Sequence, residues 1–219
     1  MEVKISRPLS IVIQRIIVAT LILVIAVLAF FVIRTAFQGE TTTPRTALER
    51  AYLDALAVVK KDPRNAKARL KLAMAYATAG RYNDALSELN IAVKLDPKDP
   101  EIYYGLGIVA KKVGDKKKAT EALERAVKLE GSVADFYREA YYELGQIYYE
   151  QKKYKEAVNA FENAAKEGPE ATYVLIALAQ AYEKAGQKDK AIEEYREILQ
   201  YVPDYKEAID ALKRLGASP

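Results

Sequence analysis

The sequence predicts an all-α protein in which one long apolar helix precedes a stack of helical hairpins. Three observations predict this class. An uncharged run of 18 residues, Ile16 to Ile33, lies near the amino terminus. Beyond it, apolar residues recur at spacings of three and four, the period of one helix face. Helix-ending prolines then return at intervals of 34, 72 and 34 residues, and a period of 34 residues is typical of stacked structural repeats.

The uncharged run is predicted to cross a membrane. Fourteen of residues 16–33 are Ile, Leu, Val or Phe. As a helix the run is about 27 Å long, close to the hydrocarbon thickness of a bilayer. Arg15 and Arg34 flank it and can reach the headgroups. We therefore assign residues 1–15 to a short tail and residues 16–37 to a transmembrane anchor, which meets the lipid bilayer through residues 16–33.

Two other interpretations of the run are a buried helix of a soluble protein and a cleaved signal peptide. The run is longer than a typical signal-peptide core, and cleavage after Ala36 would place Arg34 where a small residue is preferred. Three basic side chains and the terminal amine precede the run, and two basic side chains follow it closely. This bias predicts a single-pass cell-membrane protein with a cytoplasmic amino terminus and an extracytoplasmic domain. The alternative is a cytoplasmic domain.

A polar linker, residues 38–43, joins the anchor to the predicted helical domain, residues 44–219. Fully extended, six residues reach only about 20 Å. The domain is therefore expected to lie close to the bilayer.

The first helix of this domain has two candidate starts. Thr43 followed by Pro44 suits an N-cap and a first helical turn. Thr46 with Glu49 forms an alternative capping box one turn later. The helix carries one apolar stripe and ends before Pro63.

Four predicted hairpins follow in phase. Helices end at Pro63, Pro97, Pro169 and Pro203, and Gly131 takes the place of proline in the long interval. The predicted units are residues 66–99, 100–133, 138–171 and 172–204, and a capping helix follows over residues 205–215. Small and aromatic residues recur at matching places in each unit, as in Tyr141-x-x-Leu144-Gly145-x-x-Tyr148.

This pattern resembles the tetratricopeptide repeat family over about residues 66–204, and the helix before Pro63 is similar to a half repeat. The resemblance implies a solenoid of about four repeats that binds proteins. The departures are few: Arg69 stands where an aromatic residue is usual, and Lys116 and Lys188 each replace a tyrosine.

Small residues are predicted to let the two helices of each unit approach closely, because larger side chains there would push them apart. The first helices contribute Ala73, Gly107, Gly145 and Ala179, and the second helices contribute Ala85, Ala119, Ala157 and Ala191. A four-residue insertion at residues 131–137 predicts a longer first helix in the third unit. It leaves Phe136 and Tyr137 either at the rim or packed inside.

The resemblance also implies that the first helix of each unit lines a concave groove. The lining mixes tyrosines, amides and both signs of charge, and Tyr suits contacts because its rigid apolar body ends in a polar group. The predicted partner-binding residues are Tyr104, Ile108, Lys111, Tyr142, Gln146, Tyr149, Glu150, Tyr173 and Gln180. The alternative role for the tyrosines is packing between helices.

Composition argues against several kinds of site. The chain has no His and no Cys, so the commonest general base and thiolate metal sites are missing. It has no glycine-rich phosphate loop, nucleophile elbow or metal-ligand spacing. The net charge of +4 is small for a nucleic-acid binder. We expect no enzyme activity, catalytic residue, metal, cofactor, nucleic-acid partner or small-molecule substrate.

The expected function is therefore a membrane-tethered protein–protein interaction module. It would act as a scaffold, assembly factor or accessory subunit of a membrane or envelope complex and bind a protein partner near the bilayer, an expectation based on similarity of architecture. One alternative is a cytoplasm-facing receptor or adaptor of inverted topology. Another is a structural subunit that packs through its transmembrane helix.

Overall fold

The computed structural model describes residues 7–38, 46–129 and 134–218. Every regular element in these ranges is an α-helix, so the all-α class is confirmed. The chain divides into two compact units, Met1–Arg45 and Thr46–Pro219.

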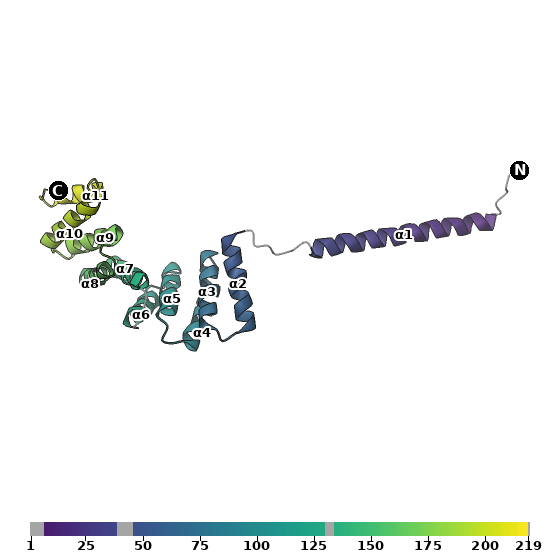
Figure 1. Ribbon diagram of the computed structural model, residues 1–219, viewed down its shortest axis with the longest axis horizontal. Helices are drawn as coiled ribbons and strands as arrows, with labels where there is room; N and C mark the ends of the chain where they lie inside the picture. Colours follow the sequence, from purple (N-terminus) through teal and green to yellow (C-terminus); the bar gives the residue numbers. More distant parts are fainter. Residues whose placement is uncertain (1–6, 39–45, 130–133, 219) are drawn as a thin grey trace. The chain divides into compact units, whose positions relative to one another are not determined.

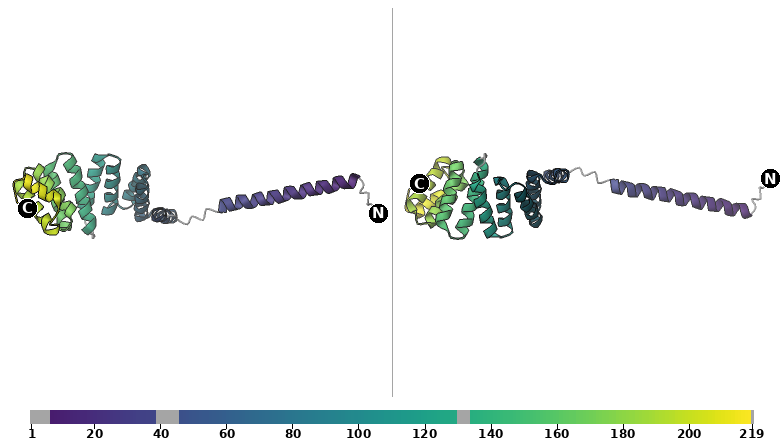
Figure 2. Two further views of the ribbon diagram at one scale, coloured as in Figure 1. Left: turned by 90° about the horizontal axis from the view of Figure 1, so that it is seen from above. Right: turned by 90° about the horizontal axis from the view of Figure 1, so that it is seen from below.

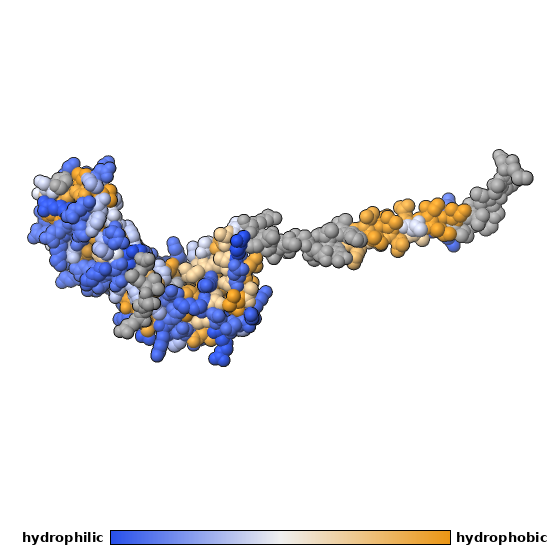
Figure 3. Space-filling model, in the orientation of Figure 1, coloured by the Kyte–Doolittle hydropathy of each residue, from blue (hydrophilic) through white to orange (hydrophobic). Residues whose placement is uncertain are grey.

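The first unit contains α1 (Arg7–Gln38), which begins earlier than the predicted anchor. Pro8 fits the first turn of a helix, where its missing N–H would have no partner. Within α1, Ile13–Phe30 is long and apolar enough to cross a membrane, and its side chains are exposed in this structure. Figure 3 shows hydrophobic residues along this stretch. A helix that is apolar on all sides is typical either of a buried core helix or of a membrane span.

The second unit begins with α2 (Ala47–Lys61). The Thr46 side chain accepts a hydrogen bond from the Glu49 backbone N–H at 3.1 Å, so Thr46 is the N-cap. Of the two predicted starts, the capping box at Thr46 is the one present in the structure, and Thr43 and Pro44 lie outside the described residues. Residues 39–45 lie outside the described residues.

Four helical hairpins and a last helix follow α2. They are α3 (Ala66–Thr78) with α4 (Tyr82–Leu95), α5 (Pro100–Lys112) with α6 (Lys116–Lys128), α7 (Ala134–Glu150) with α8 (Tyr154–Glu167), α9 (Thr172–Lys184) with α10 (Lys188–Tyr201), and α11 (Lys206–Arg214). Figure 1 and the two views of Figure 2 show the helices of this unit stacked in chain order. The predicted solenoid is confirmed.

The turn inside each hairpin needs a left-handed residue. Gly80, Gly114 and Gly186 take φ values of 75°, 83° and 77°, which glycine adopts without a steric penalty. The third hairpin has Lys152 at the same place, with φ 60°. The third turn is therefore formed by a residue that is strained in this conformation.

Small residues allow close helix contacts, as predicted. The expected neighbour Ala119 lies close to Gly107, with its carbonyl oxygen 3.3 Å from an added Cβ, but large side chains lie closer still. A Cβ added at Gly107 would lie 2.6 Å from Leu123 Cγ, and one at Gly145 would lie 2.6 Å from Phe161 Cε1. Ala119 and Ala157, the expected neighbours, are fully buried. The space above each glycine is thus occupied mainly by the large residue one turn further along the second helix.

The insertion before the third unit lengthens its first helix. Helix α7 has 17 residues, whereas α3, α5 and α9 have 13 each. Phe136 is half-buried and packs edge-to-face on Tyr104, with ring centroids 5.0 Å apart. Tyr137 donates a hydrogen bond to the Leu129 carbonyl. Both aromatic residues are therefore packed rather than free at the rim, and the suggested cap Ser132 lies outside the described residues.

Candidate functional site

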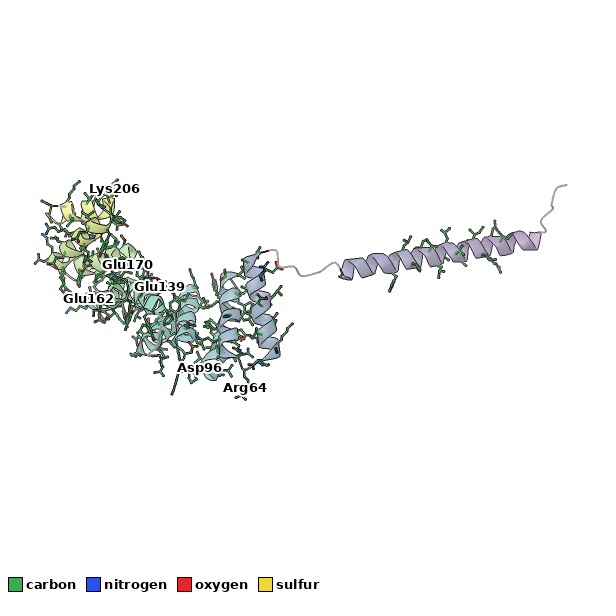
Figure 4. All side chains as sticks on the ribbon, in the orientation of Figure 1. Arg64, Asp96, Glu139, Glu162, Glu170 and Lys206 are labelled. Atoms are coloured by element: carbon green, nitrogen blue, oxygen red, sulfur yellow. The ribbon has the colours of Figure 1, made fainter. Side chains whose placement is uncertain are left out.

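The first helices of successive units are tied side by side by polar contacts. Lys111 Nζ lies 2.6 Å from Glu143 Oε2, between α5 and α7. Glu150 of α7 pairs instead with the second helix of the preceding unit, where Lys116 Nζ at the start of α6 lies 2.8 Å from its Oε2. A link between first helices also joins α7 to α9, where the Tyr173 hydroxyl donates to Glu139. Figure 4 labels Glu139 on α7. Two predicted partner-binding residues, Lys111 and Glu150, therefore already have partners within the chain.

Aromatic rings extend this side-by-side contact. Tyr142 lies edge-to-face with Tyr173, with ring centroids 4.9 Å apart, and its ring also meets Phe161 at 5.7 Å. Gln146 Nε2 donates to the Tyr142 hydroxyl at 2.7 Å. The structure thus brings Tyr142, Gln146 and Tyr173 together. Tyr173 has the most open ring of this group, with 41% of the residue exposed.

Tyr104 has a different environment. Burial raises its pKa to about 12, helped by the nearby charges of Glu143 and Glu139. Its ring is covered by Phe136. The geometry favours packing for Tyr104. Ile108 lies on the same helix and is half-buried.

A hollow of about 780 Å³ lies at the carboxyl end of the solenoid. It combines residues of α7, α9, α10 and α11. Its lining residues are Tyr149, Gln180, Glu183, Lys184, Tyr195, Lys206, Glu207, Asp210, Ala211 and Arg214. Of the nine predicted residues, Tyr149 and Gln180 line this hollow, and Figure 4 labels Lys206 at the start of α11.

Hydrogen bonds fix part of the hollow. Glu183 Oε1 accepts from the Tyr195 hydroxyl and from Arg214 Nη2, each at 2.7 Å. Gln180 Nε2 donates to Glu207 Oε1 at 2.7 Å and so ties α9 to α11. Lys184 and Lys206 are exposed beside these fixed groups. The hollow thus places exposed cations next to hydrogen-bonded carboxylates and a tyrosine ring, a surface suited to a polar peptide segment.

The α11 side of this hollow was not among the predicted partner-binding residues. Those residues came from three units, and the last helix was expected to act as a solubilising cap. A signal was present, because Leu212 follows Leu178 by one repeat length and both are buried. The register therefore makes α11 the first helix of a further unit, with its concave side open to the hollow.

Within the described residues, no group of three or more Asp or Glu side chains is placed to hold a metal ion. The exposed surface of the repeats combines tyrosines, amides and charged groups. Partner binding by the nine predicted residues stays a prediction.

Comparison with known proteins identifies the repeats. Family models described as "Tetratricopeptide repeat" match residues 148–215 and 104–160, and one described as "TPR repeat" matches residues 75–114. Among curated proteins, human protein O-mannosyl-transferase TMTC1 is 30% identical over 166 residues, covering 73% of this chain and 18% of that protein. TPR repeat-containing protein MJ1428 of Methanocaldococcus jannaschii is 26% identical over 162 residues, and the match covers 56% of this chain and 29% of the length of MJ1428. The chain thus spans less than a third of the length of either relative.

Solved structures share the solenoid. A crystal structure of MamA has a TM-score of 0.62 and 28% identity, covering 80% of this chain and 95% of MamA. PilF of Pseudomonas aeruginosa has a TM-score of 0.67 at 18% identity, covering 84% of this chain and 79% of PilF, which shows the common fold alone. The chain therefore contains tetratricopeptide repeats, and this solenoid is a protein–protein interaction module.

Proposed function

We propose that this protein is a membrane-tethered scaffold, assembly factor or accessory subunit that holds a protein partner close to the bilayer. The observation that carries the proposal is the hollow between α9 and α11, where the exposed Lys184 and Lys206 stand beside hydrogen-bonded carboxylates. Preformed polar groups of both signs around a tyrosine ring favour one bound orientation of a peptide over others.

Tethering is supported by the apolar stretch Ile13–Phe30, which has the length a bilayer requires. Eight residues lie between the end of α1 and the start of α2. Eight extended residues span at most about 28 Å. With α1 in a membrane, the repeats would be confined to its surface, and their partner would be a membrane protein or a protein that reaches the membrane.

A non-catalytic role is part of the proposal. The chain lacks His and Cys. Several of its acidic side chains, such as Glu143 and Glu124, pair with Lys or Tyr groups on helix surfaces. The match to the human O-mannosyl-transferase covers 18% of that protein, so it gives no support for transferase activity in this chain.

The binding proposal is tested by gentle detergent co-purification of the full chain. Lys184→Glu with Lys206→Glu reverses two exposed charges at the hollow. The matched control is Lys94→Glu with Lys188→Glu, which makes the same charge change at exposed sites outside the hollow. The expected result is that the first pair loses the co-purifying protein and the control pair retains it. Equal recovery from both would refute binding at the hollow.

Protease digestion of sealed cells or vesicles tests the topology. We expect external protease to cut the repeats, which places them outside the cytoplasm. Repeats that survive external digestion would support the cytoplasm-facing adaptor instead.

A third possibility, a structural subunit that packs through α1, is tested by replacing residues 7–38 with an unrelated transmembrane helix. Our proposal predicts that partner binding survives this exchange.

A further inference from the structure

A second groove lies at the amino end of the solenoid, between α2 and α3. It has a volume of about 610 Å³ and mostly apolar walls. The exposed fractions of Leu48 and Val58 are 37% and 43%. Figure 3 shows hydrophobic residues at the surface of this end. The lining residues are Leu48, Ala51, Asp54, Ala55, Val58, Asn65, Lys67, Ala68, Lys71, Met74, Ala75 and Thr78.

The repeat register shows what kind of element fits this groove. One repeat length of 34 residues relates Ala51, Ala55 and Val58 of α2 to residues of α4. The equivalent residues, Ala85, Leu89 and Ala92, are completely buried. In that complete hairpin, α3 is the helix that packs on α4. The open wall of α2 therefore matches a surface that the first helix of a unit covers elsewhere in the chain.

The α3 wall of the groove follows the same rule. Ala68, Lys71 and Ala75 correspond to Ile102, Gly105 and Val109 of α5, which are buried. A Cβ added at Gly105 would lie 3.0 Å from Leu70 Cδ1, so α3 contacts this face of α5 directly. Both walls thus have the shape that receives one helix, antiparallel to α2 and beside α3.

Charges in the complete units indicate where a bound helix carries its own. In the first hairpin, Arg69 Nη1 of α3 lies 2.5 Å from Glu88 Oε2 of α4, and both side chains are largely buried. Asp54 of α2 takes the place of Glu88 and forms no ion pair with the described residues. A helix in the groove would therefore place a basic residue over Asp54.

The opposite flank has the opposite sign. Between complete units, Lys111 in the last turn of α5 pairs with Glu143 of α7 at 2.6 Å. Lys71 of α3 takes the place of Glu143, and its ammonium group likewise forms no ion pair within the described part of the chain. An acidic residue in the last turn of a bound helix would face Lys71.

We propose that this groove binds an amphipathic α-helix of a partner protein, which completes the half repeat begun by α2. Arg69, Ala73 and Lys111 each occupy a defined position in the first helix of their unit. The same three positions in the bound helix set which kinds of residue it carries there. A small residue lies over Ala51 and Ala55, as Gly107 does over Ala119 and Leu123. A basic residue four positions earlier lies over Asp54, and an acidic residue four positions later faces Lys71.

Two occupants from the chain itself fit less well. Helix α1 has no Asp or Glu between residues 7 and 38, so it offers no carboxylate to Lys71. In a second copy, α11 has Lys213 one repeat length after Ala179, where a small residue is needed. This groove is also separate from the α9–α11 hollow, so the inference does not depend on the outcome at the hollow.

The test uses a defined helical probe and the full chain in detergent. The probe is a peptide of residues 65–79 with the change Ala77→Glu, stapled on its solvent face, which carries Arg69, Ala73 and the new Glu in the inferred order. The control peptide has the same composition with the Arg and Glu exchanged. Fluorescence anisotropy measures both affinities for the natural chain and for the variant Asp54→Lys/Lys71→Glu.

The natural chain should prefer the probe by about tenfold, the size expected for two partly desolvated charge pairs. The charge-exchanged variant should prefer the control peptide by a similar factor. A preference that does not reverse between the two chains would overturn the inference, as would the failure of both peptides to bind.

Chain-derived occupants are detected with a single thiol, because the natural chain has no Cys. Without peptide, Val58→Cys should react with a maleimide as fast as Ser87→Cys, an exposed control on α4, and the probe should slow only the former. Protection of the Val58→Cys thiol without peptide would contradict the inference. Protection independent of protein concentration would assign the groove to the chain's own segment, and concentration-dependent protection would assign it to a second copy.

Discussion

The contact between Gly145 and Phe161 provides the sharpest test of how the repeats hold together. A methyl group at residue 145 would lie 2.6, 2.7 and 2.9 Å from three atoms of the Phe161 ring. Carbon atoms pack best at about 3.5–4.0 Å, so the ring would have to move by about 1 Å. Phe161 is only 2% exposed and also meets Tyr142. The ring therefore has little room to move.

Two opposing effects set the magnitude. Overpacking of a core costs about 1–3 kcal/mol, whereas Gly to Ala inside a helix gains about 0.5–1 kcal/mol. We expect Gly145→Ala to lower the free energy of unfolding by about 1 kcal/mol and Gly145→Leu by about 3 kcal/mol. Urea unfolding followed by circular dichroism measures both changes, and hydrogen exchange in α7 and α8 locates them.

Gly105→Ala is the matched control. Its methyl group would lie 3.0 Å from Leu70 Cδ1 and 3.2 Å from Leu89 Cδ2, which are ends of flexible side chains. We expect a change within about 0.5 kcal/mol, because small shifts of these ends relieve the contact. If Gly145→Ala proves more stable than the natural chain, as helix propensity alone would give, the packing argument is refuted.

Three further predictions follow from single contacts. Lys152→Gly should raise the free energy of unfolding by about 1 kcal/mol, because glycine relieves the left-handed backbone at φ 60°; an unchanged urea midpoint would contradict this. Lys111→Ala and Glu143→Ala should show a coupling energy of about 1 kcal/mol in a double-mutant cycle, since each side chain of the pair is less than one-third exposed; additive effects would count against the link between α5 and α7. Burial raises the pKa of Glu194 from 4.5 to about 7, with help from neighbouring carboxylates. The folded state therefore binds the extra proton, and stability falls as pH rises from about 4.5 to 7. Glu194→Gln should raise the melting temperature at pH 8 and leave it unchanged at pH 4; an equal effect at both pH values would exclude this cause.

Periodicity made most of the fold predictable from the sequence. Each hairpin contains two helices with apolar stripes, and a glycine or proline marks most of the turns, so element type and order follow from local signals. The close approach at Gly107 and Gly145 was also predictable, because both residues recur in phase with Ala73 and Ala179. Small residues at matching positions therefore allow the register of the repeats to be predicted from the sequence.

The structure decides two points that the sequence left open, the start of α2 and the environment of Phe136. Thr43–Pro44 and Thr46 both suit a helix start, and the hydrogen bond from Glu49 to Thr46 decides between them. The insertion before α7 gave no sequence signal that separates exposure of Phe136 from packing. Its partner Tyr104 lies in another unit, and such a contact depends on how units stack.

The candidate site was harder to predict than the fold. Family register indicates which side chains face the groove, but it does not show which of them are already bonded within the chain. Lys111 and Glu150 pair with residues of neighbouring units, and α11 contributes half of the hollow that contains Tyr149 and Gln180. Long-range side-chain geometry decides these points, and no local spacing encodes it.

Hydrogen exchange of the full chain, with and without its co-purified partner, tests the central claim most directly. Binding at the concave side slows exchange of amides in the elements it contacts and stabilises. The account predicts added protection concentrated in α9 and α11, around Gln180 and Lys206, with α4 and α6 unchanged. Protection confined to α4 and α6, or none anywhere in the repeats, would contradict it.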